Sequence, residues 1–295
     1  MSDASPDQPA ASQSTGRAGR NLPAAIAVAV VLLVVVAASL AFRPEPFVAV
    51  VAAVVCLGLW ELRTAFARRE LNLPTAPLLV GAVGILIAAH LGGGWALLSA
   101  YVLTILAVIA WQLIDGSSED ILRSAAAGTF AVTYLPLLAA FVVLMLEQPE
   151  GNWRIAMFIL FAVANDTGGY IAGVLFGKHP LAPNISPKKS WEGMVGSVLA
   201  TVAVGVIGSV LVLRLPLLPA DGSAVWRSGL VFGLGLGVLT AFTATVGDLA
   251  ESLLKRDLGV KDMGSLLPGH GGVLDRVDSI VFSAPFVYLA FSVVT

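Results

Sequence analysis

Charged residues are scarce in this sequence. Asp, Glu, Lys and Arg make up 12% of its 295 residues, whereas they make up about a quarter of a typical water-soluble domain. The formal net charge of −2 leaves no basic face to neutralise the phosphates of DNA or RNA, so we expect no nucleic-acid partner. The single cysteine, Cys56, excludes an intrachain disulfide and is expected to pack as a small hydrophobic residue.

Long apolar runs are abundant instead. Hydrophobic residues make up 57% of the chain, and its mean hydropathy is +0.89. A helix that crosses a bilayer needs about 20 mostly apolar residues, because no backbone polar group can stay unpaired in hydrocarbon. The sequence therefore predicts an all-α, polytopic integral membrane protein with about nine transmembrane helices. The expected spans are residues 24–42, 45–62, 76–91, 95–114, 124–146, 153–176, 193–213, 229–252 and 276–294.

Three parts are expected along the chain. Residues 1–23 are polar and lack large hydrophobic side chains, so they are predicted to form a disordered cytoplasmic tail. Residues 24–150 would form the N-terminal transmembrane helices. The first apolar run is longer than the apolar part of a signal peptide, so it is expected to be a transmembrane helix. Residues 151–295 would form the catalytic helices, because the polar residues inside apolar runs concentrate there.

The basic residues predict the orientation, since cytoplasmic loops retain Lys and Arg. If the N-terminus is cytoplasmic, the basic residues in outer segments are only Arg43, Arg154, Arg214 and Arg227. We therefore expect a multi-pass protein of the cell (plasma or inner) membrane with its C-terminus outside and its active site on the cytoplasmic face. Glycines recur in the stretch GLVFGLGLGVLT from Gly229, and we expect them to let helices pack closely.

The end of the run 229–252 carries charge on one face. Asp248, Glu251, Ser252 and Lys255 are spaced i, i+3, i+4 and i+7, which aligns them along a helix. A helix end favours Lys255 and Arg256 at its negative pole. That does not explain Asp248, which lies within the apolar run, where ionisable residues are costly and usually functional.

Two more aspartates begin the last span. Asp275 and Asp278 are three residues apart, and capping of a helix N-terminus accounts for one of them. If the last two spans are antiparallel neighbours, Asp248 and Asp275 lie at the same depth, and their repulsion needs a cation between them. Oxygen ligands of this kind suit Mg²⁺, so these two aspartates are the predicted metal ligands.

The loop between these spans reads Pro-Gly-His-Gly-Gly over residues 268–272. Its glycines let backbone amides approach an anion. His270 alone is more typical of a loop hydrogen bond than of catalysis, but its glycine neighbours favour contact with a substrate. Cationic donors for the same anion are Lys255, Arg256, Lys261 and Arg276.

Two stretches at the same membrane face are further candidates. In ISPKKSWEG (185–193), Lys188 and Lys189 precede a helix and either hold phosphate or anchor the helix with Trp191 at the interface. The run 153–176 carries a polar group in an apolar environment. This group is Asn165, Asp166 and Thr167. A carboxylate there should face a polar cavity or a basic partner.

Paired aspartates, basic donors and a glycine-rich turn are typical of phosphoryl or nucleotidyl transfer with a metal ion. Their position at a bilayer surface implies a lipid partner. The run from Ser252 to Asp278 reads SLLKRDLGVKDMGSLLPGHGGVLDRVD. It resembles the signature of the phosphatidate cytidylyltransferases (CDP-diacylglycerol synthases) at every fixed position. That signature is S-x-apolar-K-R, four residues, K-D, and then P-x-H-G-G-x-x-D-R-x-D. GDLAES, SPKKSWEG and AVANDTGGY resemble further blocks of that family, so the resemblance covers about residues 155–295.

The resemblance implies that CTP and phosphatidate react to CDP-diacylglycerol and pyrophosphate with Mg²⁺. It implies metal binding by Asp248 and Asp275, and also a homodimer. Together with the pattern of charges, this predicts as catalytic residues Asp248, Asp275, Asp278, Lys255 and Arg256. The predicted substrate-binding residues are Lys188, Lys189, Ser252, Lys261, His270, Gly271, Gly272, Arg276 and Asp166.

Two other functions fit parts of the pattern. A CTP-dependent lipid kinase of the polyprenol or phytol type would transfer the terminal phosphate to an alcohol. A secondary transporter would use Asp166, Asp248 and Asp275 as ion sites, but it predicts acidic sites in both halves and repeat symmetry. The complete signature and the clustering on one membrane face favour the cytidylyltransferase.

Overall fold

The computed structural model describes residues 22–41, 43–115, 120–218, 225–264, 266 and 271–294, with the backbone alone for residues 22–29. Residues 1–21 of the expected tail and His270 lie outside the described residues. The helices are α1 (Leu22–Leu40), α2 (Pro44–Ala67), α3 (Thr75–Asp115), α4 (Ile121–Val132), the π-helical η1 (Thr133–Leu137), α5 (Leu138–Leu146), α6 (Gly151–Phe176), α7 (Trp191–Leu211), the 3₁₀-helical η2 (Val225–Arg227), α8 (Gly229–Leu258) and α9 (Leu274–Val294). Two short strands, β1 (Pro180–Ala182) and β2 (Ser186–Ser190), lie between α6 and α7.

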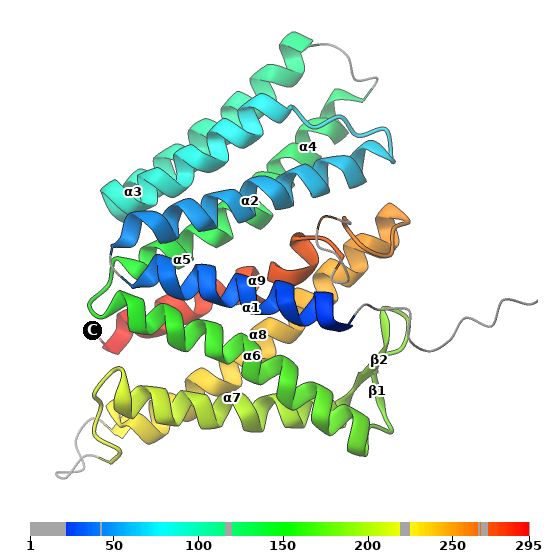
Figure 1. The fold of residues 1–295 in the computed structure, drawn as a ribbon. Coiled ribbons are helices and arrows are strands. Elements are labelled where there is room, and N and C mark those ends of the chain that lie inside the picture. Colours follow the sequence, from blue (N-terminus) through cyan, green and yellow to red (C-terminus); the bar gives the residue numbers. More distant parts are fainter. Residues whose placement is uncertain are drawn as a thin grey trace, which may run out of the picture.

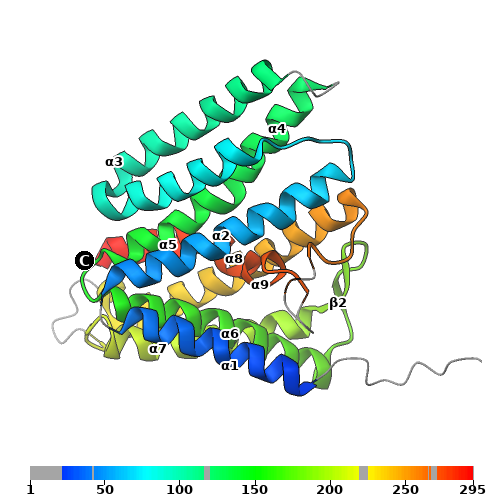
Figure 2. The same cartoon turned by 45° about the horizontal axis from the view of Figure 1, so that its top comes forward.

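The helices confirm an all-α membrane protein. Among the described residues, seven helical stretches are long and apolar enough to cross a membrane, with α4, η1 and α5 forming one of them. Each segment expected from the sequence falls on a helix, and α3 holds both 76–91 and 95–114. Gly93 interrupts α3 with φ 64° and ψ −155°, and the chain doubles back there (Figures 1 and 2). The number of nine spans stays a prediction.

The strands are the main departure from a helical chain. They pair antiparallel, with Pro180 opposite Ser190 and Ala182 opposite Ser186. Glu192 at the start of α7 holds this hairpin, because its carboxylate accepts the backbone amides of Lys178 (3.1 Å) and His179 (3.3 Å). Ser190 caps α7 by accepting the amide of Gly193 at 3.1 Å. The hairpin is therefore fixed to the helix that follows it.

Glycines bring α7 and α8 into close contact. A Cβ atom built on Gly233 would meet the backbone of Val206, and one built on Gly237 would meet the backbone of Val202. A glycine therefore removes the side chain that would separate the two backbones. The expectation that glycines of this stretch serve packing is confirmed for Gly233 and Gly237, whereas Gly235 faces open space.

Helix α9 carries Asp275 and Asp278, and a buried acid from a distant helix caps its N-terminus. Glu61 of α2 is 3% exposed and accepts the backbone amides of Val273 (3.0 Å) and Leu274 (2.9 Å). These amides begin a helix and have no partner within it, and a negative charge also complements the helix dipole there. The N-terminal half of the chain thereby positions the helix that carries the aspartates.

A buried base lies at the other end of α9. Arg154 of α6 is 3% exposed and donates to the carbonyl oxygen of Phe291 at 3.4 Å and to Gln148 at 2.6 Å. Its guanidinium also lies over the Phe291 ring, 5.3 Å from the centroid. A positive charge at a helix C-terminus is favourable. Charges of opposite sign therefore bracket α9.

We predict that Glu61→Gln destabilises the protein. The glutamine side chain retains one acceptor oxygen, but its NH₂ group would face a backbone N–H that also donates. The backbone amide of either Val273 or Leu274 therefore loses its acceptor. This costs about 1–3 kcal/mol of unfolding free energy and should lower the Tm of the detergent-solubilised protein. Glu45→Gln, on the exposed first turn of the same helix, is the matched control. Equal melting of both variants and the wild type would contradict this role of Glu61.

Candidate active site

A cavity of about 390 Å³ opens between α6, α7, α8, α9 and the hairpin. It lies toward the end of the molecule where the hairpin, the end of α8 and the start of α9 meet, opposite the C-terminus (Figure 1). Six carboxylates line it, namely Asp166, Asp248, Glu251, Asp262, Asp275 and Asp278. Four cations line it too, namely Lys188, Lys189, Lys255 and Arg276. A chain with little charge thus gathers much of it in one place.

Lys255 joins the two helices of the predicted site. Its ammonium donates to Glu251 on the same helix at 2.6 Å and to Asp275 on α9 at 2.9 Å. The three side chains are 17%, 1% and 5% exposed. Removing one member of a buried ion pair leaves its partner uncompensated and is strongly destabilising. Lys255 therefore fixes the distance between α8 and the start of α9.

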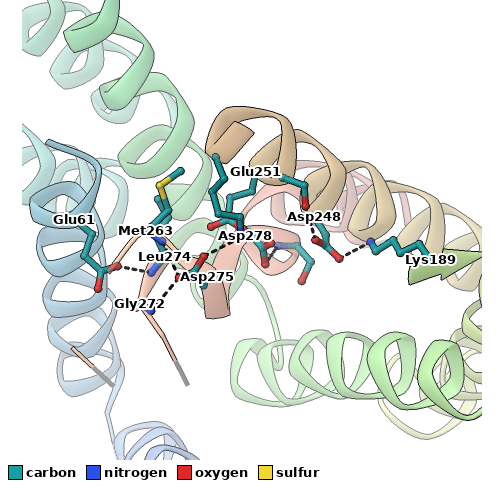
Figure 3. Close-up of polar contacts among 12 residues, drawn as sticks. Glu61, Lys189, Asp248, Glu251, Met263, Gly272, Leu274, Asp275 and Asp278 are labelled. Atoms are coloured by element: carbon teal, nitrogen blue, oxygen red, sulfur yellow. Dashed lines mark hydrogen bonds and ion pairs between the residues drawn. The ribbon is translucent and has the colours of Figure 1, made fainter. Parts of the chain in front are cut away.

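Asp275 organises the loop before α9 (Figure 3). Its second carboxylate oxygen accepts the backbone amides of Met263 (3.0 Å) and Gly272 (2.9 Å). Gly271 has φ 82°, in the region that favours glycine. A Cβ at Gly272 would meet the carboxylate of Glu61. The sequence predicted that the amides of Gly271 and Gly272 face a substrate anion, whereas the amide of Gly272 here faces Asp275.

Asp248 pairs with the hairpin. It forms an ion pair with Lys189 of β2 and lies 3.5 Å from the hydroxyl of Ser252. Asp278 accepts the backbone amide of Ser279 at 2.7 Å and lies close to Glu251 and Asp248. Figure 3 shows Asp278 between Asp275 and Asp248. Asp275, Asp278 and Asp248 therefore form a row of carboxylates across α8 and α9, with Lys255 paired at one end and Lys189 at the other.

Asp248 and Asp275, the predicted Mg²⁺ ligands, both line the cavity, and the Mg²⁺ site itself stays a prediction. Among the described residues, no group of three or more His, Cys, Asp or Glu side chains is arranged to hold a metal ion. Asp248 and Asp275 each contact a lysine, rather than facing each other directly. Their donors are carboxylate oxygens along one cavity, which is the chemistry that Mg²⁺ prefers. A bound ion would have to compete with Lys189 and Lys255 for them.

The other predicted residues divide into two groups. The residues that line the cavity are Asp166, Lys188 and Arg276. For Asp166 this agrees with the expectation that a carboxylate within an apolar run faces a polar cavity. Ser252, Arg256 and Lys261 are not among its lining residues. Arg256 donates to the carbonyl oxygen of Ile185 at 3.3 Å and so ties α8 to the hairpin.

Sequence reasoning missed four residues here. Glu251 shares the helix face of Asp248, and Asp262 belongs to the K-D pair of the signature, so both carried a signal. Glu61 is an acid near the end of an apolar run, which is a functional signal in membrane proteins. Asn165 is a buried amide that lines the cavity. The sequence placed it in the same polar group as Asp166, but only Asp166 was predicted to bind substrate.

Comparison with known proteins gives consistent matches. The model of the cytidylyltransferase family matches residues 23–294. A Mycobacterium leprae protein named phosphatidate cytidylyltransferase is 36% identical over 287 residues, covering 92% of this chain and 88% of that protein. A Mycobacterium tuberculosis protein of the same name is 34% identical over 290 residues, covering 94% and 84%. One from Synechocystis is 46% identical over 125 residues, covering 42% and 38%. The chain belongs to the cytidylyltransferase family.

Proposed function

We propose that the protein is a phosphatidate cytidylyltransferase, which converts CTP and phosphatidate to CDP-diacylglycerol and pyrophosphate. The observation that carries this proposal is the cavity of carboxylates and cations, built from the segments that match the signature. Relatives that bear this name and align with most of the chain support it. The apolar helices around the cavity fit a lipid substrate.

The reaction needs positioning and charge neutralisation more than acid–base chemistry. A phosphate oxygen of phosphatidate attacks the α-phosphorus of CTP, a new P–O bond forms, and the bond to pyrophosphate breaks. The attacking oxygen is already anionic, so no general base has to remove a proton. Lys188, Lys255 and Arg276 line the cavity and would neutralise the charge that develops on the phosphates.

Mg²⁺ is part of the proposal, with Asp248 and Asp275 as the residues that would hold it. When bound, the ion would neutralise phosphate oxygens and so stabilise the leaving pyrophosphate. Phosphates entering the cavity would attract Lys189 and Lys255 and thereby free oxygens of both aspartates. Lys255 would stay anchored to α8 through Glu251, its partner on the same helix.

The membrane arrangement is proposed to have nine spans, a cytoplasmic N-terminus and a cytoplasmic active site in the cell membrane. The position of the cavity at the hairpin end supports this, because that end carries Lys178, Lys188 and Lys189. The opposite end carries Arg43, Arg214 and Arg227 in short connections. We further propose a homodimer, as the family resemblance implies.

The activity is tested with purified protein, Mg²⁺, phosphatidate and CTP labelled in the α-phosphate. We expect label in a liponucleotide and release of pyrophosphate. A polyprenol or phytol acceptor, supplied in a parallel reaction, should stay unphosphorylated. Formation of CDP with a phosphorylated alcohol, and none of the liponucleotide, would identify a lipid kinase and reject the proposal.

The metal residues are tested with Asp248→Asn and Asp275→Asn. Loss of a carboxylate that holds the ion should lower turnover by about 100-fold or more. It should also remove the rise in Tm that Mg²⁺ with CTP gives the wild type. Asp257→Asn, exposed at the same end of α8, is the control and should behave as the wild type. Normal turnover at the wild-type Mg²⁺ concentration in both variants would remove the assignment.

The orientation is tested with single cysteines in a Cys56→Ser background. Asn184→Cys lies in the exposed turn of the hairpin, and Leu217→Cys lies in an exposed connection between α7 and α8. In intact cells, a membrane-impermeant maleimide should label the cysteine at 217, and the one at 184 only after permeabilisation. The reverse pattern would place the cavity outside.

A further inference from the structure

One wall of the cavity holds a buried acceptor without a partner. Asn165 of α6 is 7% exposed and lines the cavity. Its amide nitrogen donates to Asp166 at 3.2 Å, and its carbonyl oxygen Oδ1 is buried with no hydrogen-bond partner. The reverse orientation of the amide would put two acceptor oxygens together. A buried polar atom of this kind needs an explanation, and a ligand that donates a hydrogen bond supplies one.

The surroundings of Asn165 also accept rather than donate. Asp166 adds a carboxylate beside it. The hydroxyl of Ser197 already donates to the backbone oxygen of Asn165 at 2.7 Å. The hydroxyl of Thr245 already donates to the sulfur of Met194 at 3.2 Å. Asn165 and Asp166 therefore offer acceptor oxygens to whatever enters, while the neighbouring hydroxyls of Ser197 and Thr245 donate within the protein.

Cations lie on the other walls. Lys188 and Lys189 come from β2, Lys255 from α8 and Arg276 from α9. The α6 residues that line the cavity contain no base. They are Asn165, Asp166, Gly169, Tyr170 and Gly173. A phosphate group, which has acceptor oxygens and negative charge, meets no cation on the α6 wall, whereas the cations that can pair with it lie on β2, α8 and α9.

An aromatic ring stands on the same face of α6. Tyr170 lines the cavity, is 72% exposed and follows Asp166 by four residues, which places the two side chains side by side. Aromatic side chains stack on nucleobases, with no dependence on hydrogen bonds. Acceptor oxygens next to an available ring are the chemistry that recognises a nucleoside.

We infer that Asn165, Asp166 and Tyr170 form the nucleoside subsite of the cavity. The inference rests on the proposed function, because of its two substrates only CTP carries several hydrogen-bond donors, on the ribose hydroxyls and the 4-amino group of cytosine. The ester and phosphate groups of phosphatidate are acceptors. CTP therefore enters with its nucleoside against α6 and its phosphates toward β2, α8 and α9, where the carboxylate row lies.

The test compares Asn165→Leu with Asn152→Leu, an exposed residue on the same helix at its opposite end. We expect Asn165→Leu to raise the KM for CTP by about tenfold or more, with the KM for phosphatidate unchanged. It should also reduce the preference for CTP over dCTP, which lacks the ribose 2′-hydroxyl, or over UTP, which lacks the 4-amino group. The analogue whose discrimination falls identifies the donor that Asn165 accepts.

Tyr170→Leu is the second variant, and it is expected to fold because the side chain is largely exposed. It should weaken the binding of cytidine alone, measured as the shift in Tm that added cytidine produces, by a similar factor. An unchanged cytidine shift in Tyr170→Leu, together with unchanged nucleotide preference in Asn165→Leu, would overturn the subsite. If Asn165→Leu is not monodisperse in detergent, an unchanged cytidine shift in Tyr170→Leu overturns it alone.

Two other outcomes separate this inference from its alternatives. A change only in the Mg²⁺ concentration required for activity, with nucleotide preference intact, would show that the Asn165 oxygen serves a cation and would overturn the subsite. Failure of the wild type to make liponucleotide would reject the proposed function itself. Wild-type turnover with the expected loss of discrimination in the variants supports both.

Discussion

The arrangement of the site depends on one half-buried ammonium group. Lys255 contacts Glu251 on its own helix and Asp275 on the next, and Asp275 in turn holds the amides of Met263 and Gly272. Two helices and the loop between them therefore share one charged centre. Because charges with little exposure are stable only when paired, the backbone around Lys255 has few alternative arrangements. The carboxylate row on α8 and α9 follows from this constraint.

The two halves of the chain have different roles, but they are not independent. Glu61 and Arg154 bracket α9 with charges that oppose its dipole. Each also satisfies backbone groups that α9 itself cannot pair. The plainer N-terminal helices therefore do more than anchor the protein, since one of them sets where the aspartates of α9 lie. Polar groups inside apolar surroundings act over long sequence distances here because no water competes for them.

Ion pairs link lysines and carboxylates across the cavity. Lys189 pairs with Asp248, and Lys255 pairs with Asp275. Such pairing lowers the cost of holding many ionisable groups at the edge of a bilayer. Phosphates could therefore replace the aspartates as partners of the lysines, and a metal ion could replace the lysines as a partner of the aspartates. The α6 wall differs, because its acceptors are offered to the cavity.

The sequence by itself determined the helical membrane architecture and the expected helical segments, and it pointed to the C-terminal half, from which the residues lining the cavity come. Hydropathy and local spacing carry this information, since lipid forces each apolar run to pair its backbone internally, and the signature lies within one continuous stretch. Only the tertiary structure decided that Lys189 meets Asp248, that Lys255 meets Asp275 and that Glu61 caps α9. These contacts join residues 59, 20 and more than 200 positions apart. The packing of helices brings such partners together, and no periodicity along the chain predicts that packing.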